Sequence, residues 1–494
     1  MVHPMSVPQP HQMPLAPPSQ PGQPGQPVLD PVRAVLDRSL HELAALGGDL
    51  VAHANRIGQT LWSPPRVVVA GRLKAGKSTL VNALIGAPVA ETAALEATNV
   101  VAVYQDGAPS RIEVVGLDGS RTQRPIERSH ATDLGRPVTE IAYVHRFLPS
   151  AAIRDLALID TPGLATLTVE NDTATRRALI DGFEQTRNAS VDADAAVFLF
   201  DSVPRADEIA FLRQLGFTPL NTLGVLSRAD GFGEGVLGQR DPLDHAHEYA
   251  QTLARALDGT VLTVLPVAGL LAETSHTGRL TEADARAVAA LAGLDPFELI
   301  DLVDSDNPAP LTPELRDRLL DLVGEYGLIR GRDAATGGAH ALNQWLSHHS
   351  GVGRLQQVLH QTLGRFAAIH RAGRIVQELE QLAYTHPQRD HIRQIVHQVR
   401  REPVMDDVVL FGCLRGMLAA DPDSPVVDEL NRILLGTTDA ERVGLTPAAG
   451  HPEVQAAIGE RLAWVQRQSI STMSAAEDAA LTALLATYAM MARR

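Results

Sequence analysis

The sequence predicts a doubly wound α/β domain joined to an all-α helical bundle, and three observations lead to this fold class. Strand and helix patterns alternate from Arg66 to about Thr274, as in a sheet with helices on both faces. Residues 67–86 combine the patterns of a buried strand, a glycine-bounded loop and an amphipathic helix. From about Leu280 the strand patterns stop, and helical periodicity continues to the end of the chain.

Composition narrows the class of protein. The 494 residues, 45% of them hydrophobic, suffice for a large core and about two to four domains. The net charge of −15 argues against a general nucleic-acid surface, so we expect no nucleic-acid partner. It equally disfavours adsorption of the whole molecule to an anionic membrane, although a local basic patch stays open as an alternative.

The cysteine count and the lengths of the apolar runs indicate the cellular compartment in which the protein is expected. The single cysteine, Cys413, excludes an intramolecular disulfide and a cysteine-based metal site, which favours a reducing interior. The sequence shows no targeting signal and no run of about 18 apolar residues. We therefore expect a cytoplasmic protein, peripheral on the inner face of the cell membrane if it binds lipid.

Both ends of the α/β part are flanked by other segments. Residues 1–27 hold nine prolines and five glutamines and predict a disordered tail, which can alternatively bind a proline-recognising partner. Asp30 and Pro31 are a cap and first residue typical of a helix start, so residues 28–62 are predicted to form an N-terminal helix. Its apolar stripe needs a partner, and the long helical candidates lie after residue 280. We expect these two ends to build a composite bundle.

The remaining elements follow the same periodicities. The α/β domain is expected over residues 63–276 and the helical part, a neck and trunk, over 277–494. The predicted strands are 67–71, 99–104, 111–115, 141–145, 156–160, 195–201, 222–226 and 261–266, with a hairpin turn at Asp118 and Gly119. Helices are predicted after the glycine-bounded loop and at 173–185, 207–215, 244–257, 281–292, 313–324, 339–349, 352–384, 389–401, 405–420, 424–435, 453–467 and 474–492.

The loop after the first strand is a P-loop. Its sequence from Gly71 to Ser78 matches GxxxxGK[ST], in which backbone N–H groups and a helix N-terminus cradle phosphate oxygens. Lys77 would reach the β- and γ-phosphates, and Ser78 would ligate Mg2+. The predicted phosphate-binding residues are Gly71, Ala75, Gly76, Lys77, Ser78 and Thr79.

Lysine usage singles out a second residue in this loop. Among 43 Lys and Arg residues only Lys74 and Lys77 are lysine. Lys77 has a general reason to be lysine, because a compact ammonium fits between phosphates where a planar guanidinium does not. Lys74 has none, which suggests a catalytic role. The alternative is an ordinary solvated loop lysine.

Downstream motifs favour GTP over ATP. A hydrophobic strand ends in the DxxG sequence of residues 160–163, where Asp160 can hold a Mg2+-bound water and the Gly163 N–H can meet the γ-phosphate. At a second strand end, Ser227, Arg228 and Asp230 occupy the positions of the [N/T]KxD motif. The Asp230 carboxylate can accept from the N1 and N2 donors of guanine, a pair that adenine lacks, and Arg228 can stack on the base.

Two weaker signals complete the predicted site. After a further strand, the Ala268 N–H is a candidate contact for guanine O6. A switch threonine that ligates Mg2+ and senses the γ-phosphate is expected between the P-loop and Asp160. Thr98, just before a strand, is the favoured candidate, and Thr92 is the alternative. The fold class is therefore an α/β P-loop GTPase domain with a helical neck and trunk.

At this point the chain resembles the bacterial dynamin-like GTPases, and within them the actinobacterial isoniazid-inducible IniC type. The resemblance rests on GRLKAGKSTLVNALIG at 71–86, EATN at 96–99, DTPG at 160–163, SRAD at 227–230 and PVAGLL at 266–271. In the helical part it rests mainly on the arrangement, down to SGVGRL at 350–355. It implies a dynamin-type GTPase head, nucleotide-dependent self-association of heads, membrane remodelling at the trunk tip, and a second dynamin-like protein as a partner.

Two side chains that orient the attacking water in related enzymes are missing. Leu164 follows Gly163 where Ras-like enzymes carry a glutamine, and Leu73 stands where dynamins carry one. These absences predict slow GTP hydrolysis without association, or a binding module with little turnover. Lys74 occupies the position at which some relatives of dynamin carry an arginine finger. We hypothesise that head-to-head association moves Lys74 onto the phosphates, with Arg72 as a weaker candidate.

A basic helical hairpin is the candidate membrane contact. Residues 350–401 contain eight arginines against three acids, and the hairpin tip is predicted near Thr385 to Asp390. The alternatives are a solvated or self-associating bundle face, and a rival contact at the apolar C-terminal residues 481–494. The predicted function is GTP hydrolysis coupled to self-association and membrane remodelling. The alternative is an Era-like assembly or signalling GTPase that acts on protein or RNA without membrane contact.

Overall fold

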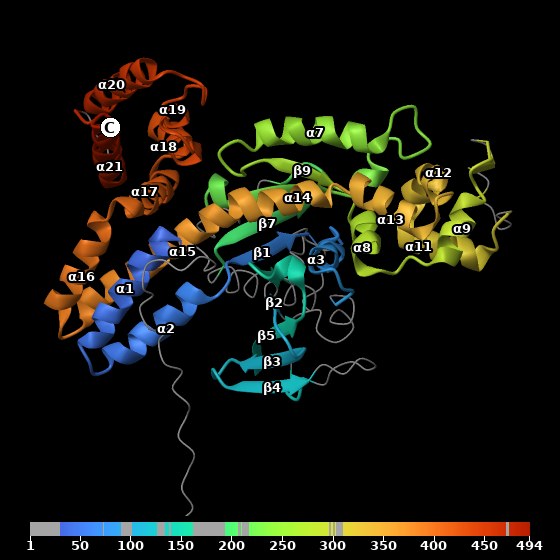
Figure 1. The fold of residues 1–494 in the computed structure, drawn as a ribbon, viewed down its shortest axis with the longest axis horizontal. Helices are drawn as coiled ribbons and strands as arrows, with labels where there is room; N and C mark the ends of the chain where they lie inside the picture. Colours follow the sequence, from blue (N-terminus) through green and yellow to red (C-terminus); the bar gives the residue numbers. More distant parts are fainter. Residues whose placement is uncertain are drawn as a thin grey trace, which may run out of the picture. The chain divides into compact units, whose positions relative to one another are not determined.

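A computed structural model of the chain describes residues 30–72, 74–89, 101–125, 134–137, 140–161, 193–205, 209, 217–295, 298–299, 302, 310–470 and 474–494. These residues form two compact units (Figure 1). The helical unit contains residues 30–63 and 372–406, and the sheet unit contains residues 64–371 and 407–494. Each unit is therefore assembled from two segments that lie far apart in the sequence. The predicted tail lies outside the described residues.

The sheet unit is built around a nine-stranded mixed sheet with the order β4-β3-β5-β2-β6-β1-β7-β8-β9. Strands β6, β1, β7, β8 and β9 run parallel to one another. Strand β2 pairs antiparallel with β6 and parallel with β5, and β3 pairs antiparallel with β5 and β4. The strands are β1 Arg66–Gly71, β2 Ala102–Asp106, β3 Arg111–Gly116, β4 Arg121–Pro125, β5 Ile141–Leu148, β6 Ala157–Asp160, β7 Ala195–Phe200, β8 Thr222–Ser227 and β9 Val264–Val267.

Each of the eight predicted strands overlaps a strand of the structure, and a ninth strand was missed. Strand β4 was not predicted, although the hairpin turn that leads into it was. Its sequence, RTQRP, has no apolar residue, and its side chains are mostly exposed at the edge of the sheet. A strand without a buried face leaves no alternation of apolar and polar residues to detect.

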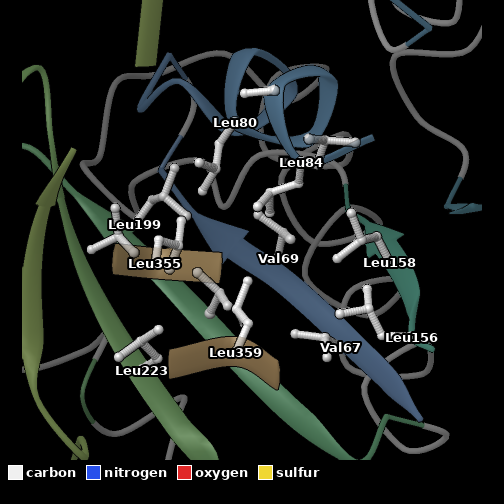
Figure 2. Close-up of a cluster of buried hydrophobic side chains, with 14 of the residues drawn as sticks. Val67, Val69, Leu80, Leu84, Leu156, Leu158, Leu199, Leu223, Leu355 and Leu359 are labelled. Atoms are coloured by element: carbon white, nitrogen blue, oxygen red, sulfur yellow. The ribbon is translucent and has the colours of Figure 1, made fainter. Parts of the chain in front are cut away.

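The two faces of the sheet are covered by different helices. Val67 and Val69 of β1 point to one face, where α3 (Lys77–Ile85), α8 (Gly269–Thr277) and α14 (Val352–Val358) pack on the sheet. Val68 and Ala70 point to the other face, part of which is covered by α7 (Pro242–Ala256). Figure 2 shows Leu355 and Leu359 next to the strands on the first face, together with side chains of α3. This alternation follows from the period of two in a strand.

The segment from Val352 to Ala367 belongs to the core of the sheet unit. It consists of α14, the π-helical segment η5 (Leu359–Leu363) and the start of α15 (Gly364–Thr385). Leu355 and Leu363 are fully buried in the same cluster as β1, β7 and α3. The sequence pattern placed residues 352–384 in the helical bundle, because an amphipathic stripe does not show what it packs against. In the structure the first half of this stripe packs on the sheet.

A buried ion pair lies where the chain passes between the units. Arg371, which is 4% exposed, is paired with Asp194, which is 0% exposed. The same guanidinium donates to Pro64 O at 2.9 Å, and the same carboxylate accepts from the Arg66 N–H at 2.8 Å. His370 Nδ1 lies 3.2 Å from Asp194 O. Asp194 thus ties α15 to the amino-terminal ends of β1 and β7.

A group of helices follows β9 in the sheet unit. Apart from α8, these are α9 Glu282–Ala289, α11 Pro313–Arg330, α12 Arg332–Ala335 and α13 Gly338–His349. They share a core that includes Leu271 of α8, Leu322 and Tyr326 of α11 and Leu342 of α13. Helix α11 is interrupted at Gly324, whose φ of 63° and ψ of −179° are not helical.

The helical unit pairs the N-terminal helices with the hairpin of α15 and α16 (Arg389–Arg401), whereas residues 277–371 and 407–494, also predicted for the bundle, group with the sheet unit. Asp49 accepts from His386 at 3.1 Å, and Arg56 is paired with Glu378. The prediction of a single N-terminal helix is wrong, because α1 (Pro31–Ala45) and α2 (Leu50–Trp62) are separate. Two glycines with left-handed φ angles, 77° at Gly47 and 65° at Gly48, end the first helix.

The helices after residue 406 complete the sheet unit. They are α17 Asp406–Ala420, α18 Pro425–Leu435, α19 Asp439–Arg442, α20 His451–Gln468 and α21 Ala475–Met491. The apolar residues near the C-terminus are buried among them, and Tyr488 donates to the buried Glu429. The large apolar side chains of residues 481–494 that are buried, Leu481, Leu484, Tyr488 and Met491, therefore belong to the core of these helices. Across the part of the chain that the structure describes, no helix combines the length and apolarity needed to cross a bilayer.

The position of α14 generates a stability prediction. Leu355→Ala removes a fully buried side chain from the sheet core, so we expect it to lower the free energy of unfolding by about 2–5 kcal/mol. The measurement is denaturant unfolding of the full chain. Gln361→Ala, an exposed position on the following segment, is the control and should change stability by less than about 0.5 kcal/mol. Equal effects of the two variants would contradict the placement of α14 in the core.

Candidate functional site

The predicted nucleotide motifs meet at one edge of the sheet. Gly71 ends β1, Asp160 ends β6, Ser227 ends β8 and Val267 ends β9. These strands are mutually parallel and lie in the order β6, β1, β7, β8, β9. Ligands of α/β proteins bind outside the carboxyl ends of such strands. The topology therefore brings four segments, spread over about 200 residues of sequence, to one site.

Two glycines shape the P-loop. Gly71 has a φ of 153°, and a Cβ at this position would lie 2.5 Å from Leu199 O of the neighbouring strand β7. Gly76 has a φ of 89° and immediately precedes α3. A side chain at Gly71 would push β1 away from β7, and one at Gly76 would strain the turn that presents the N-terminus of α3.

Lys77 is folded back onto the loop. Its Nζ donates to Gly71 O at 3.1 Å and to Arg72 O at 2.9 Å, and its side chain is only 7% exposed. Burial lowers the pKa of Lys77 to about 8, against the opposing effect of the nearby Asp160 carboxylate. The ammonium is thus held at the mouth of the loop with its charge poorly solvated, which favours the arrival of phosphate oxygens.

Burial also disfavours the charged form of Asp160, the carboxylate near Lys77. Burial raises the pKa of Asp160 to about 6, although Lys77 and the Thr161 N–H act in the opposite direction. Its Oδ1 is buried and has no hydrogen-bond partner among the described residues. A carboxylate oxygen without a protein partner suits Mg2+, which takes one or two protein oxygens and completes its shell with phosphate and water. The Ser78 hydroxyl, at the start of α3, is the second oxygen that the motif predicts. These residues fit the ion that the motifs imply.

Three predicted residues cannot be placed. Thr98, its alternative Thr92, and Gly163 lie outside the described residues. Within the described ranges there is no cluster of three or more His, Cys, Asp or Glu side chains that could hold a metal ion.

Arg228 links the base motif to the P-loop. Its backbone is left-handed, with a φ of 56°, and its Nη2 donates to Lys74 O at 2.7 Å. Ser227 is buried and donates to Phe200 O at 3.3 Å, which joins the ends of β7 and β8. Arginine in place of the usual lysine therefore holds the carbonyl of Lys74, while its guanidinium plane stays exposed for stacking.

Asp230 and Ala268 differ in how well they suit the base. Asp230 is half-buried, and burial raises its pKa, an effect that donors from a guanine edge would offset. The Ala268 N–H, by contrast, donates to Ser350 O at 2.9 Å. The predicted contact between Ala268 and guanine O6 would require this bond to break, and it stays a proposal.

Comparisons with known proteins identify the family of the chain. Residues 66–221 match the family model described as 50S ribosome-binding GTPase. The isoniazid-induced protein IniC of Mycobacterium tuberculosis (strain CDC 1551 / Oshkosh) is 31% identical over 474 residues, which cover 89% of this chain and 93% of the relative. The chain belongs to the IniC family. It is a bacterial dynamin-like GTPase of the IniC type.

Two further similarities are more limited. The isoniazid-induced protein IniA of the same strain is 38% identical over 130 residues, which cover 24% of this chain and 20% of that protein. A solved structure described as "An oligomerised bacterial dynamin pair provides a mechanism for the long-range sensing and tethering of membranes" is 11% identical, with a TM-score of 0.31, and covers 95% of this chain and 77% of that one.

The structure adds residues to the site of this IniC-family chain that the sequence did not indicate. The backbone carbonyl of Ser350, just before α14, accepts the hydrogen bond of the Ala268 N–H, and Gly324 of α11 lies beside Asp230. Glu273 of α8 is buried and accepts from Asn82 of α3 at 2.9 Å, which fixes the P-loop helix to α8. The one available signal for Gly324 was a glycine at the end of the predicted helix 313–324. The contacts of Ser350 and Glu273 arise from tertiary packing.

The Arg228 contact predicts a graded effect on nucleotide binding. Arg228→Ala removes a charge-assisted hydrogen bond to the P-loop and a stacking surface, so we expect GDP affinity to fall by roughly tenfold or more. Arg228→Lys restores the usual motif residue and keeps a donor, and it should bind within about threefold of the parent chain. Titration with a fluorescent GDP measures both. Equal affinities for the Ala and Lys variants would show that the contact is not used.

Proposed function

We propose that this IniC-family GTPase uses Mg2+ to hydrolyse GTP and couples hydrolysis to association of its GTPase heads and to membrane remodelling. The observation that carries the proposal is Lys74. It is one of two lysines in the chain, it lies in the P-loop, and it adopts a left-handed backbone with a φ of 63°. Such a conformation costs a residue other than glycine about 1–2 kcal/mol.

In the proposed site each residue has a separate task. Lys77 binds the β- and γ-phosphates with the P-loop amides from Ala75 to Thr79, and Asp230 accepts from the guanine edge. Ser78 and Asp160, together with Thr98, would hold Mg2+, which supplies neutralisation of phosphate charge when bound. Gly163 would offer its amide to the γ-phosphate. None of these groups orients the attacking water, and both positions where relatives carry a glutamine, 73 and 164, are leucine.

Lys74 is better placed to assist hydrolysis in a dimer of heads than in a monomer. Its side chain is exposed, while its own carbonyl is held by Arg228 at 2.7 Å. The backbone is therefore fixed and the ammonium faces solvent at the mouth of the phosphate loop. Contact with a second head would exclude water and direct the ammonium to the transferred phosphoryl group, where one added positive charge is worth about 10³-fold or more in rate.

The proposed role of Lys74 is tested by measuring the rate of GTP hydrolysis per molecule at increasing protein concentration, for the parent chain and for Lys74 variants. In the parent chain we expect the rate per molecule to rise with concentration. Lys74→Ala should abolish that rise while GDP affinity stays within about threefold, because nucleotide binding is assigned to Lys77. Lys74→Arg should keep part of the rise.

Lys74→Gly is a sharper control, because it removes the charge and also relieves the left-handed strain. We expect it to be more stable than Lys74→Ala and equally deficient in stimulated turnover. Arg72→Ala tests the second candidate. A concentration dependence that survives in Lys74→Gly would remove Lys74 from catalysis and leave a solvated loop lysine.

The proposed membrane contact narrows to the hairpin tip. Of the arginines counted in residues 350–401, several are paired within the fold: Arg365 with Asp407, Arg371 with Asp194 and Arg400 with Glu380. The net positive charge of this segment therefore overstates what is available to lipid. Arg393 pairs with Asp390, but both side chains are more than half exposed, so Arg393 stays accessible to lipid. At the tip, Tyr384 is 81% exposed and Arg389 is exposed. An aromatic ring beside a cation suits the headgroup region of an anionic membrane.

Co-sedimentation with vesicles containing anionic lipid tests the tip. We expect a double Arg389→Glu, Arg393→Glu variant to lose most binding, since each reversed charge removes about 1 kcal/mol of attraction and adds repulsion. A double Arg255→Glu, Arg286→Glu variant changes the net charge equally at exposed positions of the sheet unit and should bind as the parent does. Equal losses in both would indicate a net-charge effect without a specific tip contact.

The second candidate function is an Era-like assembly or signalling GTPase without membrane contact. The family model described as 50S ribosome-binding GTPase favours it, whereas the net charge of −15 disfavours its RNA version. Stimulation of GTP hydrolysis by vesicles supports the first function, and indifference to vesicles supports the second. A second dynamin-like protein as a partner stays an expectation from the family resemblance.

A further inference from the structure

Helix α11 passes directly beside the residue assigned to guanine recognition. At Gly324 the helix is interrupted, with a φ of 63° and a ψ of −179°, a combination that only glycine adopts without strain. A Cβ at this position would lie 3.6 Å from Asp230 Oδ2 and 3.4 Å from Leu270 Cδ2. The interruption thus brings main chain, with no side chain, to the carboxylate of Asp230.

The position of this interruption is fixed by packing on α8. Thr274 of α8 is fully buried and donates to Leu322 O, two residues before Gly324. Three residues after it, a Cβ on Gly327 would lie 3.2 Å from Leu271 Cδ2, so the two helices are in close contact. Tyr326 donates to Asp241 at 3.2 Å. The segment from Leu322 to Gly327 is held on both sides of Gly324 and cannot retreat from Asp230 at low cost.

The charges around Asp230 come from both neighbouring elements. Burial is the largest cause that raises the pKa of Asp230, and the carboxylate of Glu325 on α11 acts in the same direction. Arg228, from the base motif itself, acts in the opposite direction. Glu325 is exposed, so it can be changed without disturbing the core.

We propose that the interrupted segment of α11 forms one wall of the guanine-base site and that Gly324 is a specificity-determining residue beside Asp230. The inference rests on the proposed role of Asp230 and extends it to a helix outside the nucleotide motifs. Glycine leaves room for the purine edge to reach the carboxylate. A side chain at 324 would fill that room and would also strain the backbone that forms the wall.

Equilibrium titration of the full chain with fluorescent GDP tests the wall. We expect Gly324→Ala to weaken GDP binding by about tenfold or more, as expected for loss of fit at a base site. The matched control is Gly278→Ala, at the end of α8, where φ is 67° and a Cβ would meet nothing within 4 Å. It also places alanine at a positive φ, here in the left-handed helical region with a ψ of 26°, away from Asp230, and should bind GDP within about twofold of the parent chain.

A second variant separates a site effect from general destabilisation. Glu325→Gln removes the like charge beside Asp230, so the pKa of Asp230 falls. GDP binding needs the ionised carboxylate and is lost as pH falls through that pKa, so the acid limb of the binding profile should move to lower pH. An altered stability alone would not displace this limb. An unshifted limb in Glu325→Gln, or equal GDP affinities of Gly324→Ala and Gly278→Ala, would overturn the proposed wall.

Asp230→Asn distinguishes failure of this inference from failure of the proposed guanine site. The variant should lose its preference for GDP over xanthosine diphosphate, because an amide can donate to the 2-oxo group of xanthine. If the preference changes while Gly324→Ala matches Gly278→Ala, the wall is wrong and the guanine site stands. If Asp230→Asn keeps the preference for GDP, the assignment of Asp230 fails, and the wall fails with it.

Discussion

The buried carboxylate of Asp194 is the interaction on which most of the sheet unit depends. It accepts from the Arg66 N–H at the start of β1 and from Arg371 on α15, and the backbone carbonyl of Asp194 accepts from Asn221 at 2.9 Å. These contacts join three segments at the amino-terminal edge of the sheet. Because α15 continues from α14 and η5, the same anchor keeps their apolar stripe on the strands that carry the P-loop. Loss of either charge would leave the other buried and unpaired, which is strongly destabilising.

The nucleotide motifs could be predicted because their chemistry leaves fixed residues at fixed spacings. Gly71, Lys77 and Asp160 lie where the pattern placed them, and the hairpin tip between Thr385 and Arg389 was also located correctly. The relative direction of the central strands was harder to predict from the sequence. Strand β2 runs antiparallel to β6, and buried strands show similar apolar runs in both directions, so the sheet is mixed where the alternation of strands and helices suggested a parallel one.

The sequence did not show which charged residues and amphipathic segments are buried, or against which elements they pack. Arg371 was counted with a basic surface, yet it is 4% exposed and neutralised by a residue 177 positions away. Leu355 belongs to a regular helical stripe, which has the same appearance whether it covers a sheet or another helix. Ser350 and Gly324 approach the base motifs from helices that carry no nucleotide signature. Each of these contacts depends on long-range packing, which local periodicity does not encode.

The division of both units into separate sequence segments has a consequence for how the chain is made. The helices α1 and α2 leave the ribosome first, but the partners that bury their apolar faces begin at Ala372. About 300 residues must be added before these partners exist, which takes roughly 15–60 s at synthesis rates of about 5–20 residues per second. During that interval the N-terminal helices present unburied apolar stripes beside a sheet unit that is itself incomplete until residues after 406 emerge. Neither unit can therefore complete its packing until late in synthesis, and the unburied apolar stripes are open to chaperones until then.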